Sequence, residues 1–194
     1  MSEDNESFAK ENIHNLVWSG FYTTDEIIQI VFEDIFDGEM NRKWITTAVH
    51  EEVKSKSNSE SDWPAQTDCD RLDFAFDQLN ETGIVALQNA GYTQSDGVAD
   101  VSDEYHQRGG PKSSITGYCF YHGQDLERAV NGEGLLLAFG DMNGIHARGI
   151  EVGQKICDTL RAAGFIVEWD GSIGERVAIP DINWQRRYST DRQE

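Results

Sequence analysis

Apolar residues repeat at helical spacing between residues 27 and 36. Together they place large side chains on one face of a helix. Thr23 stands three residues before Glu26, which is the spacing of a capping box at a helix N-terminus. Gly38 follows the last apolar residue and is expected to end the helix. The apolar face consists of Ile27, Ile28, Val31, Phe32, Ile35 and Phe36.

A second apolar stripe, from about Asn41 to Val53, predicts another helix close behind the first. Because the connection is short, the two helices are expected to lie antiparallel. Residues 1–12 are polar and acidic and are interpreted as a disordered lead-in. Residues 54–62, KSKSNSESD, have nothing to bury, which is typical of a linker. The sequence therefore predicts that residues 1–62 form an N-terminal helical hairpin.

From residue 63 onward the pattern alternates between short apolar runs and amphipathic stretches. The apolar runs predict five strands and the amphipathic stretches predict the helices between them. Strands separated by helices favour parallel neighbours, and the closing turn at Asp170 and Gly171 favours an antiparallel edge strand. Residues 63–194 are thus expected to form an α/β domain with a mixed, mainly parallel five-stranded sheet and flanking helices. The expected strands cover residues 84–88, 117–121, 134–139, 165–169 and 176–179, and the expected helices 68–81, 96–107, 124–130 and 150–164.

The charge balance narrows the classes of partner. Among 194 residues, 35 are acidic and 16 are basic, which gives a formal net charge of -19. This charge repels nucleic-acid backbones and anionic membrane surfaces. It is compatible with a basic protein partner, and equally with simple solubility or a salty habitat. The first residues lack the features of a signal peptide and no long apolar run occurs, so a cytoplasmic protein without a membrane partner is expected.

The cysteines do not suggest a metal site or a disulfide framework. Cys69, Cys119 and Cys157 are widely spaced and lie within apolar patterns, which indicates buried, reduced thiols. Cys119 and His122 stand three residues apart, but on a strand these positions face opposite sides, and no second pair of ligands accompanies them. We therefore expect neither a metal nor another cofactor.

Polar loops follow three of the predicted strands. Because ligands collect beyond the carboxyl ends of parallel strands, these loops are expected to share one rim. The third of them is Gly140–Asn143. The candidate ligand-binding residues come from the first two loops and are Gln88, Asn89, Tyr92, His122, Gln124 and Asp125.

Two interpretations of these loops stand side by side. His122 oriented by Asp125 would suit general acid or base catalysis, because imidazole titrates near neutral pH. The alternative is a structural turn in which Asp125 or Gln124 belongs to the start of a helix. The amide and phenol groups of the first loop likewise suit either a ligand or a polar turn. No catalytic residue is assigned.

Three long segments and three short closing motifs carry a resemblance to a known family. They are DCDRLDFAF (residues 68–76), GIVALQNAGYTQSDG (83–97), GYCFYHGQDLERAV (117–130) and the closing motifs VEWDG, VAIP and INWQRR. Residues 63–187 resemble a family of uncharacterised bacterial proteins, the domain of unknown function DUF6891. The resemblance implies membership of that family and brings no activity, ligand or site residue with it.

Two functions are therefore expected from the sequence. The first is an acidic intracellular binding or regulatory protein that acts through protein–protein contact with a basic partner. The alternative is an enzyme or small-ligand-binding protein that uses the polar rim at the strand ends.

Overall fold

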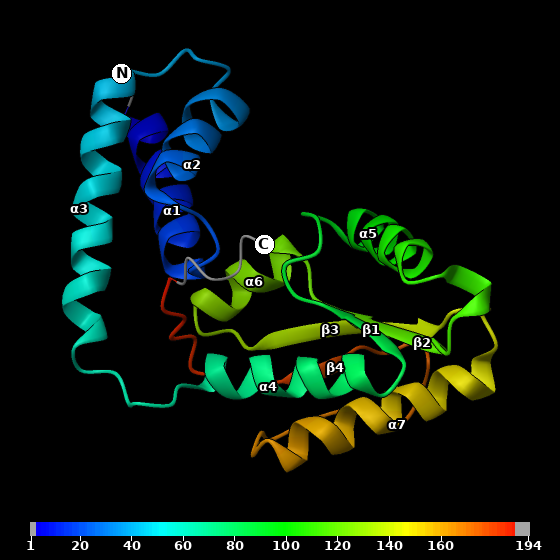
Figure 1. Ribbon diagram of the computed structural model, residues 1–194. Coiled ribbons are helices and arrows are strands. Elements are labelled where there is room, and N and C mark those ends of the chain that lie inside the picture. Colours follow the sequence, from blue (N-terminus) through cyan, green and yellow to red (C-terminus); the bar gives the residue numbers. More distant parts are fainter. Residues whose placement is uncertain (1–2, 189–194) are drawn as a thin grey trace. The chain divides into compact units, whose positions relative to one another are not determined.

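The computed structural model describes residues 3–188, which fall into two compact units. Of the described residues, 3–67 together with 185–188 form one unit, and 68–184 form the other. Figure 1 shows helices alone in the first unit and a sheet with helices in the second. No helix in the described part of the chain is both long and apolar enough to cross a membrane.

The first unit is built from three α-helices and a π-helical segment. Thr23 and Glu26 form the predicted capping box, because the Thr23 N–H donates to Glu26 Oε2 at 2.7 Å and the Glu26 N–H donates to Thr23 Oγ1 at 3.1 Å. Asn41 caps the next long helix by accepting from the Trp44 N–H. The elements are α1 (Glu3–Ser19), α2 (Thr24–Gln29), η1 (Ile30–Ile35) and α3 (Arg42–Glu60).

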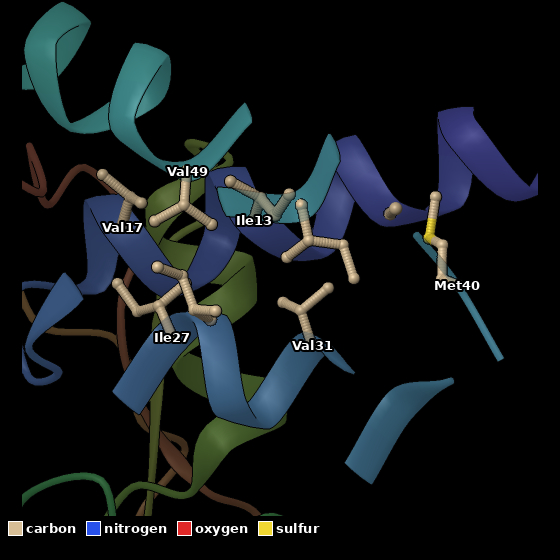
Figure 2. Packing of buried hydrophobic residues seen from close by; sticks show 9 residues of the cluster. Ile13, Val17, Ile27, Val31, Met40 and Val49 are labelled. Carbon is tan, nitrogen blue, oxygen red and sulfur yellow. The ribbon is translucent and has the colours of Figure 1, made fainter. Parts of the chain in front are cut away.

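These helices bury a common apolar core, shown in Figure 2. Its side chains come from α1, α2, η1 and α3 and from Met40, and none is more than 7% exposed. The labelled side chains of Ile13, Val17, Ile27 and Val49 point toward one another between the helices. Burial of this face stabilises helices that would be marginal alone.

Two sequence predictions for this unit are wrong. From Glu3 onward the expected disordered lead-in belongs to α1, because Ala9, Ile13 and Val17 form a buried stripe at spacing i, i+4, i+8; residues 1–2 lie outside the described part of the chain. The segment predicted as a linker, residues 54–62, is mostly helical, because α3 extends to Glu60. Lys56 explains this: its side chain is buried and its Nζ donates to the Val17 carbonyl at 3.1 Å, so tertiary contact outweighs the Ser-rich composition.

The second unit has a sheet between helices (Figure 1). The predicted helix at residues 68–81 is found with those bounds, and the predicted helix over residues 124–130 is found with one more residue. The helices are α4 (Asp68–Glu81), α5 (Gln94–Gln107), η2 (Gly110–Lys112), α6 (Gly123–Val130) and α7 (His146–Ala162). The strands are β1 (Ile84–Leu87), β2 (Gly117–Phe120), β3 (Leu135–Asp141) and β4 (Val177–Ile179).

The sheet has four strands and mixed pairing, so the prediction of five mainly parallel strands is wrong. The strands lie in the order β1-β2-β3-β4. β1 and β2 are parallel, whereas β2 with β3 and β3 with β4 are antiparallel. The α/β class itself is confirmed.

β3 runs in the opposite direction to β2. It therefore starts at the edge of the sheet where β2 ends. The loop Gly140–Asn143 therefore lies at the opposite edge from the ends of β1 and β2. The prediction that three loops share one rim is wrong for this loop.

The expected strand at residues 165–169 is reduced to one bridge. Glu168 and Ala178 exchange two backbone hydrogen bonds of 2.9 Å. Directly afterwards the Trp169 indole donates to the Ser172 carbonyl, and the Ser172 N–H donates to Asp170 Oδ1. This side-chain-supported turn takes the chain away from the sheet before a ladder can form.

Helices cover the two faces of the sheet unequally. α4 packs on β1, α7 packs on β3, and the two helices contact each other on one face, whereas α5 lies on the other face over β1 and β2 (Figure 1). Under α5, a small core contains Val85, Val101, Phe120 and Ala138. The α5 face of β3 is left without a long helix across it.

Candidate functional site

The loops after β1 and β2 lie side by side because the two strands are parallel. The Ala90 N–H donates to the Tyr121 carbonyl, and the Gly123 N–H donates to the Gly91 carbonyl, both at 2.9 Å. A Cβ atom at Gly123 would lie 2.7 Å from the Tyr92 ring. The close approach of the loops therefore requires glycine there, and it brings the six candidate residues to one edge of the sheet.

Three of the candidates have structural roles in these loops. Gln88 donates to Asp73 Oδ1 at 2.8 Å and accepts from the Tyr121 hydroxyl at 2.9 Å, so its amide ties β1 to α4 and β2. Asn89 has a φ of 51°, the left-handed conformation that asparagine tolerates in turns. His122 is the N-cap residue of α6.

The exposed candidates are Tyr92 and Gln124. Tyr92 is 55% exposed, and its hydroxyl donates to Glu127 Oε1 at 3.3 Å. Partial burial and the Glu127 carboxylate raise the pKa of the Tyr92 phenol, so it stays protonated and available as a donor. Neither Tyr92 nor Gln124 lines the hollow described below.

The remaining candidate, Asp125, belongs to a buried charged network. Its side chain is 1% exposed, and it accepts from Arg176 Nη1 with both oxygens, at 2.8 and 3.0 Å. His122 Nε2 lies 3.1 Å from Asp125 Oδ2, one of the two oxygens that Arg176 contacts. Three residues from α6, its N-cap and the approach to β4 therefore form one unit, the His122–Asp125–Arg176 network. The sequence brought the first two together; the structure adds Arg176.

The network holds His122 in its neutral form near neutral pH. Burial lowers the pKa of the imidazole, and Asp125 opposes this effect only in part because Arg176 also disfavours a second positive charge. His122 Nδ1 is buried and has no hydrogen-bond partner within residues 3–188. The imidazole therefore packs behind the ion pair instead of acting as a solvent-exposed acid.

Sequence reasoning missed Arg176 because the only local signal is a basic residue before a short strand. Its partner is 51 positions away in the chain. A buried aspartate requires a cation or several donors, so the burial of Asp125 would have predicted such a partner had it been known.

A hollow of about 390 Å³ opens on the α5 face of the sheet, next to Arg176. We call it the sheet hollow. Its floor is apolar and aromatic, and the rings of Tyr118 and Phe120 stack there with centroids 6.1 Å apart. Gly140 permits this arrangement, because a Cβ atom would lie 2.6 Å from the Tyr118 hydroxyl. The floor consists of Tyr118, Phe120, Leu136 and Ala138.

Polar groups stand at the border of the sheet hollow. Gln94 and Val98 contribute from the first turns of α5, and Glu175 and Arg176 contribute from the segment before β4. The Arg176 side chain is 33% exposed, and only its Nη1 is bonded to a group of the described chain. Its remaining N–H groups can therefore donate to a ligand. None of the six sequence candidates lines the hollow; Asp125 reaches it through Arg176.

The cysteines do not supply a reactive nucleophile to the His122–Asp125–Arg176 network or to the sheet hollow. All three are free and buried, as predicted. Burial raises the pKa of the Cys119 thiol far above neutral, and burial also raises the pKa of Cys157. A protonated, buried thiol is inert. Within residues 3–188, no three His, Cys, Asp or Glu side chains come close enough to hold a metal ion.

Comparison with known proteins bears on the family and not on the activity. Neither a curated protein nor a solved structure matches the chain. The model of one family, described as a domain of unknown function, matches residues 2–188, which is nearly the whole chain. The chain therefore belongs to the DUF6891 family.

Proposed function

We propose that the protein binds a small molecule in the sheet hollow, without catalysing a reaction on it. One observation carries this proposal: Arg176 borders an aromatic hollow while Asp125, itself in contact with His122, binds its guanidinium. A cation fixed in this way needs little reordering when it meets a ligand. An aromatic floor with convergent polar groups around it has the elements of a ligand site, although polar groups form most of the exposed lining of this hollow.

The lining defines the class of ligand. The stacked rings of Tyr118 and Phe120 suit a planar apolar body. Burial raises the pKa of the Tyr118 phenol, so its hydroxyl remains a neutral polar group in the hollow. Arg176 suits one acceptor such as a carboxylate, and Glu175 beside it disfavours a polyanion. The proposed ligand is a planar or aromatic molecule with a single acidic group.

Titration of the labelled protein with 2-naphthoate, followed by amide NMR, tests this proposal. We expect saturable shifts at Val98, Phe120 and Arg176, and weaker binding of 2-naphthylmethanol, which lacks the charge. Val98→Trp should abolish binding by filling the hollow, since Val98 lines it and is 47% exposed. Ile166→Trp is the matched control, because Ile166 is exposed but does not line the hollow. Absence of saturable shifts, or equal loss in both variants, would overturn the proposal.

A basic protein partner is a second candidate. The net charge of -19 supports it, and so does an acidic row along the exposed side of α5, at Asp96, Asp100 and Asp103. These positions follow helical spacing and therefore share one face. Capture of lysate proteins on the immobilised chain across a salt series tests this candidate. A specific basic protein released by salt, and lost with Asp96, Asp100 and Asp103 changed to Asn or Ser, would support it; retention by that triple variant would contradict it.

A further inference from the structure

A second hollow lies on the other face of the same sheet, under α7. It has a volume of about 290 Å³ and begins where β3 ends. We call it the α7 groove. It shares no residue with the sheet hollow. Whatever it binds is therefore independent of the ligand proposed above.

The groove contains a buried carboxylate that is only half satisfied. Asp141 is 6% exposed, and its Oδ2 accepts from the Asn143 and Ile145 N–H groups at 2.9 and 3.0 Å. Its Oδ1 is buried and has no hydrogen-bond partner within residues 3–188. A buried carboxylate oxygen without a donor is costly. A ligand with an ammonium group would supply both the donor and the opposite charge.

Charges of both signs border the groove on α7. Arg148, Glu151 and Lys155 line it, and their spacing of three and four residues places them on one face of the helix. Lys155 Nζ donates to the Thr82 carbonyl at 2.9 Å, which fixes this ammonium group near the start of β1. With Asp141, the lining has two cations and two carboxylates. A balanced lining favours a zwitterion over a polyanion or a polycation.

The rest of the groove is lined by two apolar residues and by Thr116. Ile84 is 1% exposed and Val152 is 6% exposed, and both contribute to the lining. They would pack against a hydrocarbon side chain of a ligand. At about 30 Å³ for each water molecule in the liquid, the volume suits a molecule the size of a free amino acid.

We propose that the α7 groove binds a free apolar α-amino acid. Its ammonium group donates to Asp141, its carboxylate accepts from Arg148 and Lys155, and its side chain lies against Ile84 and Val152. The site requires both charged groups of the ligand, because each end meets a partner of opposite sign.

Amide NMR titration with L-leucine, isoamylamine and isocaproate tests the proposal with matched probes. The amine lacks the carboxylate and the acid lacks the ammonium group. We expect saturable shifts at Thr116, Asp141 and Arg148 with L-leucine, and binding at least about tenfold weaker for each half-molecule. Equal binding of the amine or the acid, or no saturable shift with L-leucine, would overturn the proposal.

Two variants test the assigned contacts independently, so that poor folding of one still leaves a test. Asp141→Asn retains an acceptor for the turn N–H groups but loses the charge, and Arg148→Gln changes an exposed side chain. Each should weaken L-leucine binding by at least about tenfold. Arg161→Gln, on the same helix but outside the groove, should leave binding unchanged. Unchanged binding in Arg148→Gln would count against the assigned carboxylate position and overturn the proposal.

Discussion

Arg176 donates from one nitrogen to both oxygens of Asp125, at 2.8 and 3.0 Å, across 51 positions of sequence. The carboxylate is 1% exposed and the arginine side chain is 33% exposed. Asp125 is therefore fully buried, while Arg176 also borders the sheet hollow. The pair thereby couples the stability of the α6 region to the proposed ligand site.

Arg176→Met should destabilise the protein by about 3 kcal/mol at neutral pH. The variant leaves the Asp125 carboxylate buried without its cation, and an uncompensated buried charge strongly destabilises the folded state. The double variant Asp125→Asn with Arg176→Met should recover part of the loss, because the buried charge is removed. Urea-unfolding midpoints of the two variants and the wild type measure this difference.

Arg128→Met is the matched control for that experiment. Arg128 pairs with Glu133 at 3.0 Å, but the two side chains are 43% and 59% exposed. An exposed pair contributes about 0.5 kcal/mol. Losses of equal size in Arg128→Met and Arg176→Met would contradict a special role for the buried pair.

His122 should make the protein lose stability as the pH falls below about 6.5. Burial lowers the folded-state pKa of His122 below its ordinary value of 6.5, so the unfolded chain takes up a proton first. The stabilisation is complete above pH 6.5, decreases as the pH drops toward the folded-state pKa, and is constant below it. His122→Asn should reduce this decrease, whereas His50→Asn, an exposed position on α3, should not. Urea unfolding at about pH 7.5 and about pH 5 measures it.

Local patterns allowed much of the fold to be predicted. The Thr23–Glu26 capping box and the bounds of α4 depend on residues close together in the chain, and both are confirmed. The sequence pattern of a buried strand is the same in both directions, so it could not predict the direction of β3. The strand predicted at residues 165–169 failed because Trp169 and Asp170 close a turn that competes with the ladder.

The candidate site was accessible to sequence reasoning only in part. His122 and Asp125 are neighbours on one turn, so their meeting could be expected. Arg176 and the sheet hollow arise from long-range packing around β2, β3 and the segment before β4, which leaves no periodic signal. Asp141 was placed on the wrong edge because the direction of β3 was predicted wrongly.

Thr23→Ala should destabilise the helical unit by about 1 kcal/mol. The change removes the side-chain acceptor of the Glu26 N–H and leaves a donor unsatisfied at the start of α2. Thr47→Ala is the control, since the Thr47 hydroxyl donates to the Lys43 carbonyl within α3 and caps nothing. Thermal unfolding followed by circular dichroism should show a lower midpoint for Thr23→Ala alone.

Gly97→Ala should destabilise the protein although it lies inside α5, where helix propensity favours alanine by about 1 kcal/mol. A Cβ atom at Gly97 would overlap the Phe120 ring and lie 2.9 Å from the Ala90 carbonyl, so α5 must move away from the sheet. Overpacking of this kind costs about 1–3 kcal/mol, which outweighs the gain in propensity. Gly174→Ala is the control, because a Cβ atom there meets nothing within 4 Å. Urea unfolding should give a lower midpoint for Gly97→Ala only; a higher midpoint would mean that α5 does not approach Phe120 this closely.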